Sequence, residues 1–122
     1  MTTKKLVYIA SPYTKGDVAV NVRKAIDAAD NLAKHGFLPF MPLMSHFWHM
    51  IYPHEYHFWT EMDLQWVERC DCVLRLPGES AGADHEVKFA MALKLPVFHS
   101  LATLYAYYER ERNTVITFKA GE

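Results

Sequence analysis

The side chains best suited to catalysis lie between positions 79 and 86, in the run Glu-Ser-Ala-Gly-Ala-Asp-His-Glu. A strand-like run, residues 72–76, precedes this segment, and a helix-like run, residues 87–93, follows it. In open α/β sheets, turns of this kind hold the ligand. Small residues let a substrate approach the backbone, and the first amide groups of a helix favour negative charge. We therefore predict that this turn binds an anionic group, with Ser80, Gly82 and Ala83 in contact with it.

Glu86 lies a short distance behind this glycine, in the first or second turn of the expected helix. Its carboxylate can reach whatever the turn holds, and such a carboxylate serves as a nucleophile or a base. The alternative is that Asp84 and Glu86 only offset the helix dipole, since acidic residues are common in first turns. The residues of this stretch do not decide between the two interpretations.

A second carboxylate, Asp63, interrupts the apolar stripe of a helix expected over residues 55–69. The stripe is formed at spacings of three and four by Trp59, Met62, Trp66 and Val67. A carboxylate buried there without a partner costs several kcal/mol, so it must be paired, protonated or open to a pocket. One interpretation is a structural pair with Arg75 or a backbone amide. We prefer the other, a catalytic or sugar-binding carboxylate whose pKa the apolar surroundings raise.

The elements that position these groups begin with a continuous apolar run, residues 6–10, typical of a buried parallel strand. The following loop, residues 11–17, lies at the carboxyl end of that strand and is a candidate second wall of the pocket. A helix is expected over residues 18–35, with Asp17 as its N-cap and Gly36 as its stop. Ligand contacts are expected from Ser11, Tyr13, Lys15 and Asn21. An ordinary solvated position is the alternative for Asn21.

A second strand, residues 37–41, leads into an aromatic and histidine-rich segment, residues 45–54. Five of the seven histidines lie at positions 46, 49, 54, 57 and 85. The first four form two pairs that can each share a helical face, but no cysteine or carboxylate completes a ligand set of familiar spacing. We therefore expect neither a metal nor a cofactor. The rings, His46 among them, are expected to line or cover a flat heterocycle.

The chain has 122 residues, of which 51% are hydrophobic, and a formal net charge of −1. This length and apolar content suit one domain, residues 1–122, around a single core. The charge balance, without a basic run, argues against a nucleic-acid polymer or a membrane surface as partner. No signal peptide or membrane span is recognisable, and Cys70 and Cys72 are not expected to form a disulfide. We therefore expect a cytoplasmic protein with a small-molecule ligand.

Several short motifs, taken together, resemble the nucleoside 2-deoxyribosyltransferase superfamily. They are, in chain order, VYIASP at residues 7–12, DLQW at 63–66, Cys-Asp at 70–71 and SAGADHE at 80–86, within about residues 5–98. The resemblance implies a flavodoxin-like, Rossmann-like three-layer α/β fold with a small, mostly parallel sheet, whose fourth strand would be residues 96–98. It also implies that Glu86 is the nucleophile, that the Tyr8 hydroxyl positions it, and that Asp63 handles the sugar or the proton transfer to the leaving base.

The superfamily divides by its treatment of the 5′ end of the sugar. Members that act on free nucleosides carry an acidic residue six positions before the nucleophile, whereas 2′-deoxynucleoside 5′-phosphate N-hydrolases carry a serine that contacts phosphate. Here that residue is Ser80, so the resemblance implies an N-hydrolase of (deoxy)nucleoside 5′-monophosphates. A transferase that exchanges bases on free nucleosides is the alternative, because Glu79 and the Ser-Pro-Tyr-Thr loop depart from the hydrolase pattern. A non-catalytic nucleotide-binding module is the alternative from another class.

In the C-terminal segment, residues 101–108 suit a helix with a stripe formed by Tyr105, Tyr107 and Tyr108, and residues 113–118 suit an edge strand or an extended arm. Exposed tyrosines often mark interfaces. The resembling enzymes are oligomers whose neighbours complete the pocket with C-terminal residues, so at least a homodimer is expected. A monomer with a packed tail is the alternative.

Overall fold

Residues 3–120 are described by the computed structural model, with side chains as far as residue 112. The centre is a four-stranded sheet in the order β2-β1-β3-β4, in which every pairing is parallel. Its strands are β1 (Leu6–Ala10), β2 (Leu38–Phe40), β3 (Cys72–Arg75) and β4 (Val97–Phe98). This is the order of the first four strands in flavodoxin-like folds, so the predicted α/β fold class is confirmed.

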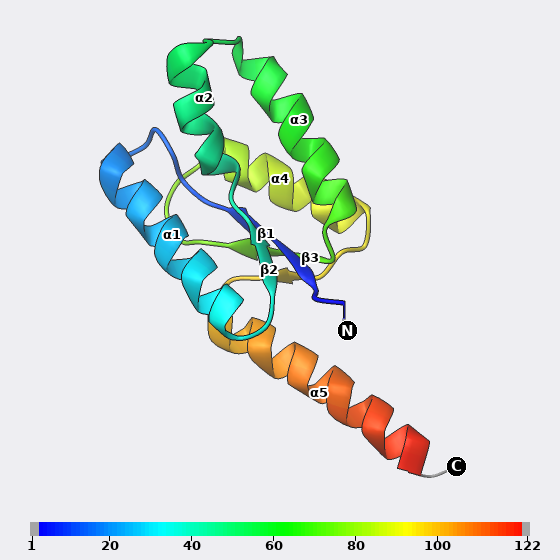
Figure 1. Ribbon diagram of the computed structural model, residues 1–122. Coiled ribbons are helices and arrows are strands. Elements are labelled where there is room, and N and C mark those ends of the chain that lie inside the picture. The colour runs from blue at the N-terminus through cyan, green and yellow to red at the C-terminus, as the bar shows by residue number, and fades with distance from the viewer. Residues whose placement is uncertain (1–2, 121–122) are drawn as a thin grey trace.

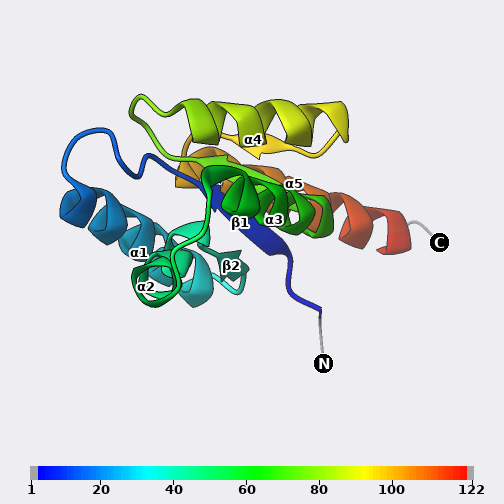
Figure 2. The same ribbon diagram turned by 90° about the horizontal axis from the view of Figure 1, so that it is seen from above.

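Five α-helices accompany the sheet: α1 (Val18–Lys34), α2 (Ser45–Ile51), α3 (Tyr56–Arg69), α4 (Ala81–Ala92) and α5 (Leu101–Ala120). One core cluster packs α1 and α5 against one face of the sheet, and a second packs α3 and α4 against the other. Figure 2 shows α1 and α4 on opposite sides of the strands. A 3-10 turn (Pro42–Met44) leads into α2, and α2 and α3 lie side by side at the top of Figure 1.

Strand β1 is buried on both faces, which explains its continuous apolar run. Because side chains alternate across a strand, Val7 and Ile9 enter the core beneath α1 and α5, whereas Tyr8 and Ala10 enter the core beneath α3 and α4. All four side chains are fully buried. The alternation therefore directs the Tyr8 ring to the face of the sheet that carries Asp63 and Glu86.

Helix α4 begins earlier than predicted. Ser80 is its N-cap, and the Ser80 side chain accepts a hydrogen bond from the backbone N–H of Ala83 at 3.1 Å. Serine is among the preferred N-caps, so the small residues behind it continue the helix instead of forming a turn. Residues 81–86, predicted to belong to the turn, therefore form the start of α4, and Glu86 lies in the second helical turn. The helix-like run expected over residues 87–93 thus begins six residues earlier, at Ala81, and the placing of Glu86 in the first or second turn is confirmed.

Helix α1 has the predicted N-terminal cap, in which Asp17 Oδ1 accepts from the backbone N–H of Val20 at 3.1 Å. The chain leaves the helix through Gly36, whose φ of +86° favours glycine. Neither Ile26, with 43% of its surface exposed, nor Ala33 is buried, although both lie at a helical spacing of three or four from Ala29. The buried face of α1 consists instead of Ala25, Ala28, Ala29 and Leu32.

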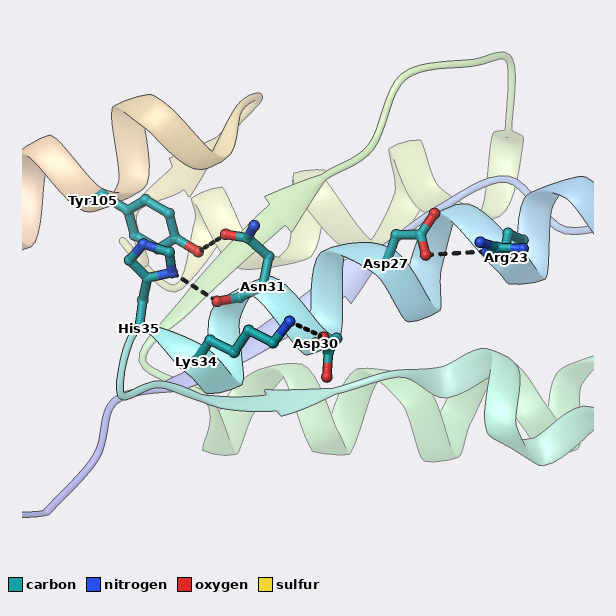
Figure 3. Close-up of polar contacts among 7 residues, drawn as sticks. All are labelled: Arg23, Asp27, Asp30, Asn31, Lys34, His35 and Tyr105. Atoms are coloured by element: carbon teal, nitrogen blue, oxygen red, sulfur yellow. Dashed lines mark hydrogen bonds and ion pairs between the residues drawn. The ribbon is translucent and has the colours of Figure 1, made fainter.

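Helix α5 continues to Ala120, so the edge strand or arm predicted over residues 113–118 is wrong. The sequence contains no glycine or proline between residue 101 and Gly121 that would stop the helix. Figure 3 shows how α5 is attached to the end of α1. The Tyr105 ring stacks on His35 with centroids 4.3 Å apart, and its hydroxyl donates to Asn31 Oδ1 at 2.6 Å.

The tyrosines predicted to form an exposed stripe on α5 are mostly used within the chain. Tyr105 and Tyr108 are partly buried against the core, and both rings contact Phe37. Tyr107 has 40% of its surface exposed and is the outward-facing member of the three. Two of the three tyrosines therefore fix α5 to its own sheet, which is the packed tail of the alternative, and an interface on α5 stays a prediction.

Candidate active site

A pocket of about 470 Å³ lies at the carboxyl ends of β1 and β3, between the loop after β1, the helices α2 and α3, and the start of α4. This is the place where parallel α/β sheets bind ligands. Most of the side chains predicted from the sequence line it, namely Ser11, Tyr13, Lys15, His46, Asp63, Ser80, Gly82, Ala83 and Glu86. Two predicted residues, Tyr8 and Asn21, do not line it. Segments far apart in the chain thus meet in one cavity.

Glu86 and Tyr8 are joined at the floor of this pocket. The fully buried Tyr8 hydroxyl donates a hydrogen bond to Glu86 Oε2. Burial raises the pKa of Glu86 to about 8, the Tyr8 hydrogen bond lowers it, the charge of Asp63 raises it and Arg75 lowers it. Burial and the Glu86 charge raise the pKa of Tyr8 far above its usual range, so Tyr8 remains a hydrogen-bond donor. Glu86 is therefore a partly shielded carboxyl group in a fixed orientation.

Asp63 comes from α3 and lines the same pocket. Burial raises its pKa to about 6. The pair with Arg75 that we weighed is wrong, because Arg75 Nη2 lies 2.9 Å from both Asp84 Oδ1 and the Gly78 carbonyl oxygen. No side chain or backbone group in the described part of the chain donates a hydrogen bond to Asp63. The carboxyl group is thus open to the pocket.

The predicted apolar stripe around Asp63 is only partly correct. Val67 is the fully buried residue of α3, whereas Trp66 has 39% of its surface exposed and stacks on Phe40. Trp59 lines the pocket. Burial raises the pKa of Asp63, as predicted, although the two tryptophans beside it are not both buried.

The loop after β1 is held by Asn21. Its side-chain amide donates to the Tyr13 carbonyl oxygen at 3.0 Å and to the Lys15 carbonyl oxygen at 2.8 Å. Lys15 Nζ lies 3.7 Å from Glu79 Oε1, and both side chains are largely exposed. Asn21, predicted as a ligand contact, thus shapes the loop instead. The Glu79 carboxylate lies close to the Lys15 ammonium group.

Ser11, the first residue of this loop, has a buried hydroxyl without a hydrogen-bond partner among the described residues. Buried hydroxyl groups are normally paired with protein, water or ligand. Because Ser11 lines the pocket, its hydroxyl is available to a polar group of a ligand. The Ser80 hydroxyl, which also lines the pocket, accepts from the backbone N–H of Ala83 and keeps its own O–H as a donor.

The wall formed by α2 and α3 is aromatic. The Tyr13 hydroxyl and His46 Nδ1 share a hydrogen bond. His49 Nδ1 accepts from Trp59 Nε1 at 2.8 Å and from the backbone N–H of His54 at 3.2 Å. Of the histidines in this segment, only His46 was predicted by residue as a ligand contact. The helical spacing separates His46 and His49 from the apolar face at residues 47, 50 and 51, and would have indicated His49 as well.

Neither a metal site nor a membrane span is found in the residues that the structure describes. No group of three or more His, Cys, Asp or Glu side chains within residues 3–120 is placed to hold a metal ion. None of the described helices is both long and apolar enough to cross a membrane. Cys70 and Cys72 are free and buried.

Comparisons with known proteins agree with this fold. A family model described as "Domain of unknown function (DUF7768)" matches residues 5–100, and no curated protein matches the sequence significantly. A 2-deoxyribosyltransferase from Bacillus psychrosaccharolyticus has a similar structure, with a TM-score of 0.59 and 20% identity over 75% of this chain and 69% of that chain. A 2-desoxiribosyltransferase from Leishmania mexicana gives a TM-score of 0.58 and 16% identity over 76% of this chain and 61% of that chain. This chain thus covers less than two thirds of the Leishmania protein.

Proposed function

We propose that this chain, which belongs to the family described as Domain of unknown function (DUF7768), cleaves the N-glycosidic bond of a (deoxy)nucleoside 5′-monophosphate. The observation that carries the proposal is the hydrogen bond from the Tyr8 hydroxyl to the Glu86 carboxyl group, in a pocket that also contains Asp63. Structures with the same fold are named 2-deoxyribosyltransferases, and those names support a reaction on nucleosides.

In the proposed reaction, ionised Glu86 attacks the anomeric carbon of the sugar, and the bond to the base breaks as the new ester bond forms. Asp63 donates a proton to the departing base, which carries away the electron pair of the glycosidic bond. Water then attacks the same carbon and gives a proton to the Asp63 carboxylate, which releases Glu86 and the sugar phosphate. Tyr8 holds one Glu86 oxygen throughout, so the other oxygen is oriented for attack.

The burial of Glu86 supports a catalytic role over a purely structural one. A helix-stabilising acid gains from being ionised near the helix N-terminus, whereas burial opposes the ionisation of Glu86 and raises its pKa to about 8. A carboxyl group perturbed in this way inside a pocket is a characteristic of functional sites. The non-catalytic nucleotide-binding module, in which Glu86 only supports its helix, is therefore the weaker interpretation.

The preference for a 5′-phosphate rests on the other end of the pocket. Ser80 caps α4 and keeps its O–H as a donor, and Ser11 has an unpartnered hydroxyl. The N-terminal amide groups of α4 add partial positive charge. Glu79 lies at Lys15, so its carboxylate is partly neutralised. These groups suit a phosphate better than they suit an uncharged 5′-hydroxyl.

The names of the structural neighbours favour a second candidate, a deoxyribosyltransferase that acts on free nucleosides. In that case a second base, and not water, resolves the glycosyl ester. The two reactions share Glu86, Asp63 and Tyr8 and differ in the acceptor. They are distinguished by products, since hydrolysis yields a free sugar phosphate and transfer yields a new nucleoside.

The test is to incubate the protein with nucleosides and nucleoside monophosphates, with and without a second base, and to identify the products by chromatography and mass spectrometry. We expect free base and sugar phosphate from a monophosphate, no reaction with Glu86→Gln, and normal reaction with Glu68→Gln, which changes an exposed acid of α3 outside the pocket. A slow substrate should leave a sugar on a peptide that contains residue 86. An adduct on another peptide, or turnover by Glu86→Gln, would contradict the mechanism.

We also infer a homodimer or larger homo-oligomer, with helix α2 at the interface. His46 and His49 face the pocket, whereas Phe47, Met50 and Ile51 share the opposite face and have 60%, 65% and 73% of their surfaces exposed. An apolar face of this kind is typical of protein contacts. A second copy that covers it would also stabilise the pocket wall on the inner side of α2.

The cytoplasmic location of the protein stays a prediction from the sequence.

A further inference from the structure

We propose that His49 selects the base, by donating a hydrogen bond from its Nε2–H to an acceptor atom on the edge of the heterocycle. The acceptor is an unprotonated ring nitrogen or a carbonyl oxygen. The inference rests on the proposed function and adds to it the contact that determines which bases the pocket accepts. Three observations carry it: the hydrogen bonds of His49, the accessibility of its second nitrogen, and its place relative to Asp63.

The hydrogen bonds determine the tautomer of His49. Its Nδ1 receives the indole N–H of Trp59 at 2.8 Å and the backbone N–H of His54 at 3.2 Å. Indole and backbone N–H groups only donate, so Nδ1 must offer its lone pair to both. A neutral imidazole carries one proton, which is therefore on Nε2. The fold thus presents a donor, and not an acceptor, at the second nitrogen of this ring.

The Nε2 atom is free to meet a ligand. No group in the described part of the chain forms a hydrogen bond with it, and among those residues the single buried side-chain nitrogen or oxygen atom without a hydrogen bond is Ser11 Oγ. His49 Nε2 is therefore reached by solvent. Because His49 is half-buried and lines the pocket, a ligand in the pocket can accept a hydrogen bond from its Nε2–H.

The position of His49 matches the place of a leaving base. Trp59, which holds His49, and Asp63 lie one helical turn apart on α3, and both line the pocket. One turn is about 5.4 Å, close to the width of a heterocycle. A base whose glycosidic nitrogen meets the proton of Asp63 therefore extends along α3 towards His49. The phosphate-binding end of the pocket, at Ser11 and Ser80, lies on other elements.

The His49 imidazole ring is also held rigidly, as the selection of a base requires. The Trp59 ring meets Trp48 and Phe58 almost perpendicularly, with centroids 5.0 Å and 4.9 Å away. Phe58 in turn stacks on His54 at 3.8 Å. The donor to Nδ1 thus cannot turn away easily, so the proton stays on Nε2. His46 differs, because a tyrosine hydroxyl can donate or accept, and its hydrogen bond with Tyr13 leaves the tautomer open.

This arrangement favours a base with an acceptor on the edge that faces α2. A C–H or N–H group there leaves the His49 donor without a partner, and such a loss lowers affinity by about tenfold or more. The contact also strengthens during the reaction, because the departing base gains negative charge. His49 therefore contributes to both base selection and bond cleavage.

The test measures binding of free bases to the full chain, which requires no turnover. Calorimetry with adenine, hypoxanthine, cytosine and uracil identifies the base that binds most tightly. Analogues of that base, each with one ring nitrogen replaced by C–H or one carbonyl removed, are then compared with the parent. We expect the wild type to bind one analogue about tenfold or more weakly than the parent.

Variants assign that difference to His49. In His49→Phe, which retains a flat ring, the parent and the analogue should bind equally weakly, whereas His49→Gln should retain part of the preference because its amide can donate. Trp59→Phe keeps a ring but frees Nδ1, and should reduce the preference. His57→Phe is the matched control, because His57 is an exposed histidine of α3 outside the pocket, and it should behave as wild type.

The inference is overturned if His49→Phe keeps the wild-type preference, if every analogue binds the wild type as tightly as the parent, or if no base binds. It fails separately from the proposed function. Cleavage of nucleotides without any base preference at His49 would leave the proposed function and remove this inference. Base binding with the expected preference, but without cleavage of nucleotides, would support this inference and contradict the proposed function.

Discussion

Burial opposes the ionisation of Glu86, although the proposed reaction needs the ionised form. The pKa of this group is raised from 4.5 to about 8 on folding. A raised folded-state pKa contributes stability that is fully present below about pH 4.5 and is lost as the pH rises through about 8. The active-site residue therefore weakens the fold under the conditions in which it is reactive, as is common for functional groups.

We predict that Glu86→Gln is more stable than the wild type, and increasingly so as the pH rises. The amide keeps the shape and accepts from Tyr8 but has no charge to bury. Near pH 5 the two proteins should melt at similar temperatures, whereas near pH 9 the variant should gain on the order of a few kcal/mol of unfolding free energy. Thermal unfolding at several pH values measures this. Glu79→Gln is the exposed control, and an equal gain there would exclude burial as the cause.

The second residue-scale prediction concerns the pH dependence of kcat/KM. Cleavage requires ionised Glu86 and protonated Asp63, whose pKa values are raised to about 8 and about 6. The profile should be bell-shaped with limbs near these values, which belong to the coupled pair. Asp63→Asn should lower kcat about 10²- to 10⁴-fold and abolish the falling limb. The remaining rising limb should move from about 6 towards 8, because it then reports Glu86 alone, and should lie somewhat below 8, because the Asp63 charge no longer raises the pKa of Glu86.

A different outcome would support a structural role for Asp63. If Asp63→Asn lowers the melting temperature while activity per folded molecule is unchanged, the carboxyl group is not the proton donor. The pH profile separates the two cases even where both activity and stability change, since a structural residue does not remove one limb.

At the scale of elements, the N-terminus of α4 places two functions on one helix. Ser80 caps the helix at one end of the pocket, and Glu86 lies in the second turn at its floor. The sugar and its 5′-phosphate would then contact the same rigid helix. The spacing between Ser80 and Glu86 along that helix would fix the position of the reacting carbon. Rigid elements position such groups more accurately than loops do.

We predict that Ser80→Asp penalises phosphate-bearing substrates selectively. Aspartate also caps helices, so α4 should form normally, but its charge lies within a few ångströms of the proposed phosphate. The ratio of kcat/KM for a nucleotide to that for its nucleoside should fall by about a hundredfold or more. Ser80→Asn, a neutral cap of the same shape, is the matched control. A wild type that already prefers the nucleoside would favour the transferase.

Helix α2 likewise has two faces, and each has its own task. The histidine face lines the pocket, and the apolar face at residues 47, 50 and 51 is exposed. With only seven residues, this helix depends on its contacts for stability. The inner contacts with α3 and the proposed contact with a second copy would together hold it in place.

For the whole molecule, we predict an oligomer that depends on the outer face of α2. Met50→Glu or Ile51→Glu places a charge in that face and should shift the protein to a monomer in light-scattering measurements. Activity should fall as well, because the pocket wall loses support. Met91→Glu, which changes an exposed methionine of α4, is the control. A wild type that is monomeric at high concentration would contradict the prediction.

The sequence by itself determined the elements of this fold and much of the pocket. Apolar runs and periodicity are local signals, and they predicted the first three strands, α1 and α3, whereas the fourth strand was implied by the family resemblance. Ligands of parallel sheets lie at the carboxyl ends of the strands, so the loops at residues 11–17 and 79–86 could be assigned to one site before any contact was known. Element ends were less accurate, because the start of α4 depends on which residue caps it.

The tertiary structure decided which side chains meet, and among these contacts only that of Tyr8 with Glu86 was implied beforehand, by the family resemblance. Tyr8 and Glu86 are 78 positions apart, and their hydrogen bond exists because β1 directs alternate side chains to the face that α4 covers. Arg75 paired with Asp84 and left Asp63 open, a choice between carboxylates that spacing cannot make. The raised pKa of Glu86 and the tautomer of His49 likewise depend on burial and on partners from other elements. Such properties arise from three-dimensional proximity, so a local pattern in the sequence does not contain them.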